Sequence, residues 1–398
     1  MENFTFHTPT EIIFGKGSEN KTVDLVKKYG GTQALVVYGK NSVIKSGILG
    51  KILTDLKSAG INSTEHGGAM PNPHLSFVYE GIKKAINSGV NFILAVGGGS
   101  AIDAAKAIAH GVANPDKDVW NDFWLRKEEL KKSTPVGVVL TISAAGSETS
   151  NSAVITNTET KQKRGLPTDF NRPRFAVMNP EFTYTLPKYQ IACGIADIFM
   201  HTLDRYFAPE SGKGLKADMT DGIAEALLKV LIKHGPAALD NPSDYSAQSE
   251  IMWAGSLSHN GITGLGRTFD FSVHQLGHEL GAMFDVAHGA SLTTMWGNWA
   301  RHVKHVNIPR FAHYARTVWN AAISDDNAAA DEGIKLTEKF FTQIGMPVCF
   351  SELGVGVQDF NVINDLANRC VFGGARKVGV FLPLNEDDCT KIYTAANR

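Results

Sequence analysis

The alternation of short apolar runs with amphipathic stretches in the first half of the chain most constrains the fold. Three runs are apolar at nearly every position: residues 33–38 (QALVVY), 91–96 (NFILAV) and 135–141 (PVGVVLT). Such strands are buried on both faces, as in parallel sheets covered by helices. Helical patterns over residues 48–59, 75–87 and 100–112, with a further strand at 61–65, complete βαβ units. We therefore predict a mostly parallel sheet in an α/β domain.

The second half has a different texture, because long amphipathic helical patterns dominate from about Leu186 onward. These patterns cover residues 187–207, 216–234, 246–260 and 331–344. A chain of 398 residues is long enough for two domains. We predict a dinucleotide-binding α/β domain at residues 1–185 and a helical metal-binding domain at 186–398, with Pro187 opening the first helix. The cleft between two such domains is the expected site.

Composition excludes several classes of function. The formal net charge is −1, so the chain lacks the excess of basic residues that is typical of nucleic-acid-binding proteins. The same charge gives no electrostatic reason to bind an anionic membrane. The four cysteines, at positions 193, 349, 370 and 389, are isolated, as in reduced intracellular proteins. The N-terminus lacks a signal-peptide pattern, and no apolar stretch approaches the roughly 18 residues of a membrane span. We expect a cytoplasmic protein that acts on small molecules.

A glycine turn follows the second buried strand. Gly97, Gly98 and Gly99 separate residues 91–96 from the helix at 100–112, with Ser100 as the expected N-cap and Asp103 completing a variant capping box. Free N–H groups at a helix start suit a pyrophosphate. Ile102 stands where the third glycine of the G-x-G-x-x-G fingerprint would fall. Both a nucleotide site and a plain tight βα turn are therefore compatible with this segment.

The end of the first buried strand indicates which nucleotide would bind. An acidic residue there holds the ribose diol of NAD, but here Gly39 is followed by Lys40, Asn41 and Ser42. These residues favour the 2′-phosphate of NADP(H) over NAD(H). The alternative is that Lys40 is a solvated turn lysine.

Carboxylate and imidazole groups gather in the helical half. Asp197 and His201 are four residues apart, as are His274 and His278, so each pair shares one helix face; His288 follows in an expected loop. One carboxylate with imidazoles suits Fe(II), Zn(II) and related ions. A single aspartate–histidine pair at this spacing is more often a salt bridge than a pair of metal ligands. The prediction of a metal site therefore rests on the two spaced pairs and His288 together. Spacing allows either His274 or His278 as a ligand.

At these residues the sequence resembles the iron-containing (group III) alcohol dehydrogenases, near their butanol dehydrogenase and NADPH-dependent aldehyde reductase branch. The motifs are GGGSAIDAAK (residues 97–106), LTISAAGSE (140–148), Asp197 with His201, and the histidines at 274, 278 and 288. Pro71-Asn72-Pro73 also matches. The resemblance covers essentially the whole chain and implies a dehydroquinate synthase-like α/β domain, an all-α C-terminal domain and a homodimer.

The resemblance also implies site residues. The metal, Fe(II) or Zn(II), would be held by Asp197, His201, His274 and His288, with His278 lining the pocket. The implied nucleotide contacts are Gly39, Lys40, Asn41, Ser42, Asn72, Gly98, Gly99, Ser100, Asp103, Thr141, Ala145, Ser152, Lys163 and Phe182. Ala145 and Ser152 depart from the family pattern, which puts their contacts in doubt.

The chemistry expected of such a site is hydride transfer between NADP(H) and an alcohol or aldehyde whose oxygen the metal polarises. His278 is a candidate proton relay and Lys163 a second catalytic candidate. Alternatively, His278 only shapes the pocket and Lys163 only neutralises phosphate. Met252, Trp253, Phe269 and Phe271 indicate either an apolar substrate pocket or plain core.

Three other functions compete with this one. A lyase of dehydroquinate synthase-like architecture would need a cluster of basic residues to bind phosphate and carboxylate groups in the cleft. Near the predicted metal ligands the main basic residues are Arg205 and Arg267, which are too few to indicate such a cluster. Glycerol dehydrogenase and maleylacetate reductase belong to the same superfamily, and the Asp197–His201 pair disfavours the metal-free reductase. A non-catalytic binding protein on this fold would show no NADPH-dependent activity with any aldehyde.

Overall fold

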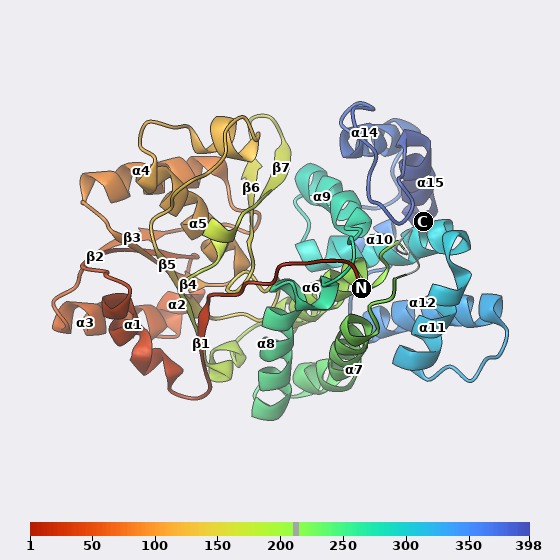
Figure 1. Ribbon diagram of the computed structural model, residues 1–398, viewed down its shortest axis with the longest axis horizontal. Helices are drawn as coiled ribbons and strands as arrows, with labels where there is room; N and C mark the ends of the chain where they lie inside the picture. Colours follow the sequence, from red (N-terminus) through yellow and green to blue (C-terminus); the bar gives the residue numbers. More distant parts are fainter. Residues whose placement is uncertain (210–214) are drawn as a thin grey trace. The chain divides into compact units, whose positions relative to one another are not determined.

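The computed structural model describes residues 1–209 and 215–398, which form two compact units (Figure 1). One unit is His7–Leu186, and the other is Pro187–Arg398 together with Met1–Phe6. The N-terminal residues belong to the second unit because the backbone N–H of Glu2 donates to Gly266 O at 2.9 Å. Each unit has its own elements and its own core.

The first unit is built on a six-stranded sheet in the order β1-β8-β5-β4-β2-β3, in which every neighbouring pair is parallel. Its strands are β1 (Glu11–Phe14), β2 (Gln33–Tyr38), β3 (Asn62–Gly67), β4 (Phe92–Gly97), β5 (Val136–Leu140) and β8 (Phe175–Met178). An antiparallel hairpin pairs β6 (Ser152–Asn157) with β7 (Gln162–Pro167). The predicted α/β class with a mostly parallel sheet is confirmed.

Helices cover both faces of this sheet, as Figure 1 shows. They are α1 (Thr22–Lys28), α2 (Ser42–Lys45), α3 (Ile48–Ser58), α4 (Leu75–Asn87) and α5 (Gly99–Ala113), with short turns η1 (Ser18–Lys21), η2 (Val119–Trp124), η3 (Asp169–Asn171) and η4 (Pro180–Thr183). Alternate residues of β2 and β4, such as Val36 and Leu94, pack with Ile52 and Leu56 of α3. Helix α5 contacts β2, β4 and β5. Burial on both faces explains why these strands are uniformly apolar.

The second unit is helical, as predicted. Its helices are α6 (Lys188–Tyr206), α7 (Asp218–Asp240), α8 (Tyr245–His259), α9 (Ser272–Phe284), α10 (His288–Val303), α11 (Ile308–Trp319), α12 (Asp326–Gln343), α13 (Phe350–Leu353), α14 (Phe360–Cys370) and α15 (Glu386–Ala396), with turns η5 (Ile262–Gly264) and η6 (Lys304–Val306). Helix α7 runs six residues beyond the predicted end at position 234, through Pro236. Among the described helices, none combines the length and apolar character needed to cross a bilayer.

Candidate metal centre and nucleotide edge

Three donor side chains converge within the helical unit. Asp197 lies on α6, His274 on α9, and His288 is the first residue of α10. One ligand atom of each lies within 4.8 Å of the other two, and Asp197 Oδ1 is 3.7 Å from Nε2 of both histidines. Two ligands about 2.1 Å from a shared ion at a tetrahedral angle lie roughly 3.4 Å apart. The spacing is therefore close to that of a metal site.

His201 joins this group through the carboxylate. It lies one helical turn beyond Asp197 on α6, with Nδ1 3.3 Å from Asp197 Oδ1. Its ring centroid is 4.4 Å from that of His274 and 4.0 Å from that of His259, on α8. The other member of the second spaced pair, His278, has its ring 6.4 Å from His274 and 5.3 Å from His288. Of that pair, it is His274 whose nitrogen faces Asp197, while His278 borders the group.

The donor atoms are buried and lack other hydrogen-bond partners. The side chains of Asp197, His201 and His274 are 4–6% exposed. Within residues 1–209 and 215–398, Asp197 Oδ1, His201 Nδ1 and His274 Nε2 find no hydrogen-bond partner. Each such atom costs about 1–3 kcal/mol when buried. A cation between Asp197 Oδ1 and His274 Nε2 would meet two of these atoms, and together with His288 these residues form a group that fits a divalent metal. His201 lies outside that group and reaches it through Asp197 Oδ1.

The two buried histidines have opposite pKa shifts. Burial, together with the neighbouring His259 and His274, holds the pKa of His201 well below its ordinary value. Burial also acts to lower the pKa of His274, but its interactions with Asp197 and Asp204 outweigh burial and raise that pKa. His201 therefore offers a neutral imidazole, which is the form that binds a metal.

The expectation that His288 lies in a loop is wrong, because it begins α10. The start of this helix lies against α6 at a glycine. A Cβ on Gly289 would stand 2.2 Å from Cys193 O, so only glycine lets the helices approach this closely. The short apolar residues around position 288 give little periodicity, and the sequence pattern therefore missed the helix start.

Three further residues lie around the histidines. Phe271 was considered for an apolar pocket and Arg205 for a basic cluster, whereas Asp204 was not predicted as a site residue. Phe271 has φ +60° and its ring centroid is 5.1 Å from that of His274. The guanidinium of Arg205 lies 4.7 Å from the Phe271 ring and donates to His201 O. Asp204 accepts a hydrogen bond from His274. A signal for Asp204 did exist, since it is seven residues after Asp197 and so shares its helix face.

The residues considered for an apolar substrate pocket divide between the site and the core. Phe269 lies 5.5 Å from Phe271, ring to ring, and is 48% exposed. Met252 is fully buried and so belongs to the core, whereas Trp253 is exposed. Phe269 and Phe271 therefore supply the apolar surface beside the histidines.

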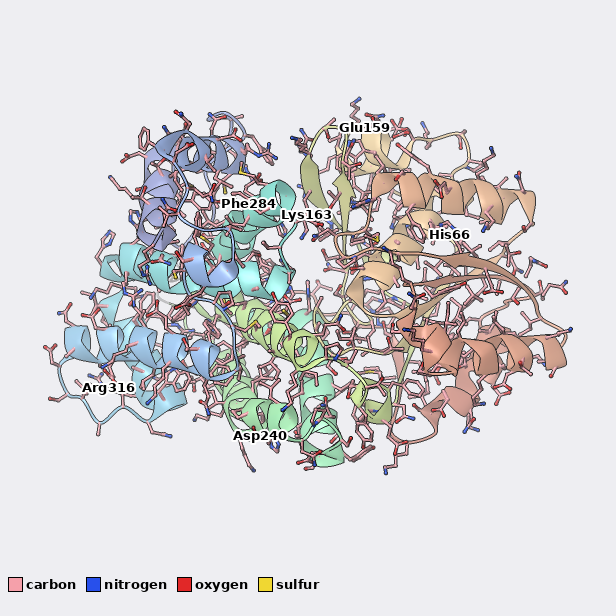
Figure 2. All side chains as sticks on the ribbon, turned by 180° about the vertical axis from the view of Figure 1, so that it is seen from behind. His66, Glu159, Lys163, Asp240, Phe284 and Arg316 are labelled. Atoms are coloured by element: carbon pink, nitrogen blue, oxygen red, sulfur yellow. The ribbon has the colours of Figure 1, made fainter. Side chains whose placement is uncertain are left out.

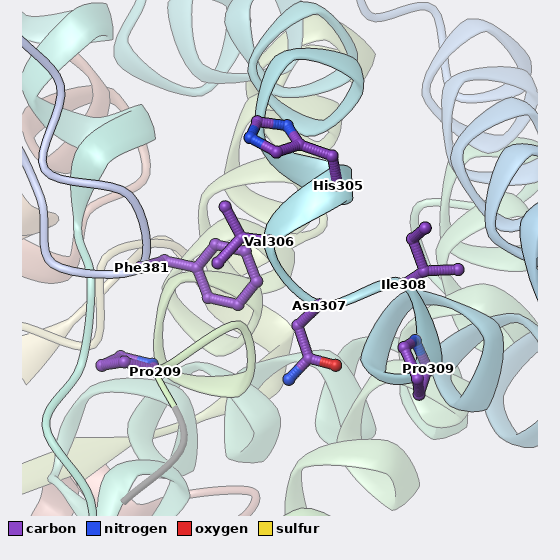
Figure 3. Close-up of a pocket in the computed structure, with 7 residues that line it drawn as sticks. All are labelled: Pro209, His305, Val306, Asn307, Ile308, Pro309 and Phe381. Atoms are coloured by element: carbon purple, nitrogen blue, oxygen red, sulfur yellow. The ribbon is translucent and has the colours of Figure 1, made fainter. Parts of the chain in front are cut away.

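A separate open pocket of about 480 Å³ lies elsewhere in the helical unit (Figure 3). Its lining comprises Pro209, His305, Val306, Asn307, Ile308, Pro309 and Phe381. This lining includes none of the predicted site residues.

In the α/β unit, the predicted nucleotide residues follow neighbouring strands. Gly39 follows β2, Gly98 follows β4 and Thr141 follows β5, and all three strands are parallel. Their carboxyl ends therefore lie along one edge of the sheet. The chain order reverses between β2 and β4, because β3 lies outside β2. Such a switch point is where nucleotides bind in open α/β sheets.

The predicted capping of the glycine turn is wrong. Helix α5 begins at Gly99, and Gly98, not Ser100, is its N-cap. A Cβ at Gly98 would lie 2.0 Å from Ile142 Cγ2, so the turn packs directly on the loop after β5. Asp103 is turned away from the helix start. Its two oxygens accept from Ser147 Oγ at 2.5 Å and from Val154 N at 2.8 Å.

Lys106, in the same motif, is fully buried beneath this loop. Its ammonium group donates to Ser147 O at 2.7 Å and to Ser152 O at 2.8 Å. Burial lowers the pKa of Lys106 to about 8. Asp103 and Lys106 thus tie α5 to the segment at 147–154, and the motif has a structural use beside any contact with a nucleotide.

The remaining predicted nucleotide residues occupy four settings. Lys163, which is labelled in Figure 2, lies on β7 and donates to Asn72 Oδ1 at 2.9 Å. Lys40, Asn41 and Ser42 are exposed after β2. Phe182, in η4, packs on the core of the sheet. Ala145 Cβ lies 3.5 Å from where a Cβ on Gly99 would stand.

Comparison with known proteins decides the family. The model of the iron-containing alcohol dehydrogenases matches residues 9–180, and that of the C-terminal domain of Fe-containing alcohol dehydrogenases matches residues 191–397. The chain belongs to the iron-containing alcohol dehydrogenase family. The predicted family is thus confirmed.

Named members of the iron-containing alcohol dehydrogenases match over nearly the full length. NADH-dependent butanol dehydrogenase A of Clostridium acetobutylicum is 37% identical over 99% of both chains. NADPH-dependent aldehyde reductase YqhD of Escherichia coli is 35% identical over 100% of both. The crystal structure of NADH-dependent butanol dehydrogenase A of Thermotoga maritima has a TM-score of 0.94 at 31% identity, covering 100% of this chain and 99% of that one.

Proposed function

We propose that this protein is a metal-dependent alcohol dehydrogenase and aldehyde reductase. It would transfer a hydride between NADP(H) and a small to medium primary alcohol or aldehyde. The observation that carries the proposal is the convergence of Asp197, His274 and His288, with unpaired buried donor atoms on Asp197 and His274, in a member of the iron-containing alcohol dehydrogenases. Similar proteins are named as butanol dehydrogenases and an aldehyde reductase.

The proposed metal ligands are Asp197, His201, His274 and His288, and the ion is Fe(II) or Zn(II), both of which accept this donor set. A divalent ion held there supplies Lewis acidity toward a substrate oxygen. The side chains of Phe269 and Phe271 would exclude water from the apolar part of a substrate, because their rings border the histidines.

His278 is the proposed proton relay. It borders the metal group, with its ring 5.3 Å from His288, and it is only partly buried. An imidazole exchanges protons near neutral pH, so this position suits transfer between substrate oxygen and solvent. For Lys163, held by Asn72, we propose a charge-neutralising contact with the nucleotide.

The preference for NADP(H) over NAD(H) rests on the end of β2. Gly39 has room for a side chain without a clash, since the nearest atom to a Cβ there is Ala69 O at 3.8 Å, an ordinary van der Waals distance. Lys40 and Ser42 are exposed beside it and can reach a 2′-phosphate. Relatives of both preferences exist, NADH-dependent and NADPH-dependent, so side-by-side kinetics with the two nucleotides test this point.

The contacts of the two arginines considered for a substrate anion argue against a lyase that acts on a phosphorylated sugar acid. Arg205 is buried against Phe271 and His201 O. Arg267 pairs with Asp221 and donates to the backbone at Tyr206 and Ala217. Both guanidinium groups are held by contacts within the protein. These contacts would have to break before either group could bind a substrate anion.

We further propose a cytoplasmic homodimer. All four cysteines are free, which fits a reducing compartment. Sedimentation of the purified protein would test the dimer.

The site-resolved experiment compares His274→Ala with His278→Ala. The first variant should be purified without metal and without butanal reductase activity. The second should keep its metal, while kcat falls by about 10²-fold because the relay is lost. Retention of a full equivalent of metal by His274→Ala would contradict the proposed centre.

A further inference from the structure

A second carboxylate lies behind the proposed metal ligands. Asp197, His201 and Asp204 are at positions i, i+4 and i+7 of α6, so they lie along one face of the helix. The residue Asp204 is 1% exposed, as deeply buried as an apolar core residue. Isolated buried carboxylates are strongly disfavoured, so its contacts need a specific explanation.

The principal partner of Asp204 is His274. Asp204 Oδ2 lies 2.6 Å from His274 Nδ1 and accepts from the His274 backbone N–H at 3.4 Å. An ionised carboxylate only accepts hydrogen bonds, so Nδ1 must carry the proton. The lone pair of the neutral ring is then on Nε2, which faces Asp197 Oδ1 at 3.7 Å.

We infer that Asp204 is a positioning residue that fixes the tautomer and ring orientation of His274 and so raises the affinity of the centre for its metal. This inference rests on the proposed function, because it takes His274 as a ligand. Hydrogen-bonded carboxylates behind ligating histidines raise the basicity of the ligand nitrogen.

The contacts of Asp204 favour a metal ion bound to Nε2, on the opposite side of the His274 ring from the carboxylate. Asp204 Oδ1 is buried and has no hydrogen-bond partner among the described residues. The nearby Arg205 directs its guanidinium to His201 O and to the Phe271 ring. A metal on Nε2 makes the Nδ1–H a stronger donor, which strengthens the bond to Asp204. The carboxylate and the metal therefore stabilise each other through one ring.

A neighbouring carboxylate, that of Asp270, has a different role from the carboxylate of Asp204. Asp270 accepts from the backbone N–H groups of Ser272, Val380 and Phe381, at 2.7–2.8 Å. Its backbone N–H donates to Asp204 O at 3.0 Å. Asp270 thus holds the start of α9 to the segment at 380–381, whereas the side chain of Asp204 is left for His274.

The test measures Zn(II) affinity of chelator-stripped protein by competition with a chromophoric chelator. Asp204→Ala removes the acceptor and should weaken Zn(II) binding about 10- to 100-fold. Asp204→Asn keeps an acceptor oxygen without the charge and should lose less. Asp221→Asn, which changes a partly buried carboxylate paired with Arg267 and Arg310, is the matched control and should bind within twofold of wild type.

The unfolding temperature of each metal-free variant distinguishes a positioning role of Asp204 from a merely structural one. If the role were only structural, the substitutions would lower the unfolding temperature and leave the Zn(II) affinity of the folded protein unchanged. Affinities of both Asp204 variants within twofold of wild type would overturn the inference. If Asp204→Ala does not fold, Asp204→Asn decides alone.

A wild-type protein that binds neither Zn(II) nor Fe(II) would instead overturn the proposed function. In that case ¹⁵N NMR of the neutral His274 ring decides the inference. A proton on Nδ1 supports it, and a proton on Nε2 contradicts it.

Discussion

At the scale of single residues, the proposed preference for NADP(H) can be tested at Gly39. Introducing Gly39→Asp places a carboxylate after β2 without a clash, where it would repel a 2′-phosphate and accept from a ribose diol. We expect KM for NADPH to rise at least about tenfold, the equivalent of ~1.4 kcal/mol, and KM for NADH to fall. Steady-state kinetics with both nucleotides measure this, and unchanged NADPH kinetics would contradict the proposed preference.

His110 makes the stability of the α/β unit depend on pH. Burial lowers its pKa to about 4, and its ring nitrogens lie 2.8 Å from Ser133 Oγ and Asn171 Oδ1. Between about pH 6.5 and 4 the unfolded chain binds a proton that the folded chain does not. The unfolding free energy should therefore fall as the pH falls through this window, by up to ~1.4 kcal/mol per pH unit.

Urea unfolding of wild type and His110→Gln across that window measures the effect. The variant should show a shallower dependence on pH. Parallel curves for the two proteins would show that another group is responsible.

At the scale of elements, the contact between α10 and α6 holds His288 in place. Gly289→Ala would force a Cβ to 2.2 Å from Cys193 O, so the helix start must move. We expect a loss of about 1–3 kcal/mol in unfolding free energy, as for other overpacked sites, together with weaker metal retention. Gly222→Ala in α7 is the control, because its Cβ meets open space and alanine favours a helix. Equal metal content in both variants would contradict the role of this contact.

The sequence predicted regular elements well and their ends and caps less well. The strand Gln33–Tyr38 and the helix Leu75–Asn87 have the predicted bounds, because burial gives the strand an unbroken apolar run and the helix an apolar face. The short strands β1 and β8 and the β6–β7 hairpin were missed, since four to six residues give little pattern. Ser100 fails as a cap because packing on Ile142 decides where the chain turns. Tertiary contact of this kind is invisible in local sequence.

At the scale of the whole molecule, each unit carries one part of the proposed chemistry. The α/β unit holds the switch point between β2 and β4, and the helical unit holds the histidine group. Spacing alone left His274 and His278 equivalent, and only the packing of α9 against α6 sets them apart. Asp204 could have been found from its position on α6, whereas the roles of Phe271 and Arg205, both considered from the sequence, depend on contacts across the fold.

The most direct test of the central claim is butanal reduction by NADPH with chelator-stripped protein, before and after addition of one equivalent of Fe(II) or Zn(II). The proposal requires that stripping abolish turnover and that one of these ions restore it in proportion to the metal bound. Full activity in protein shown by elemental analysis to be metal-free would contradict it.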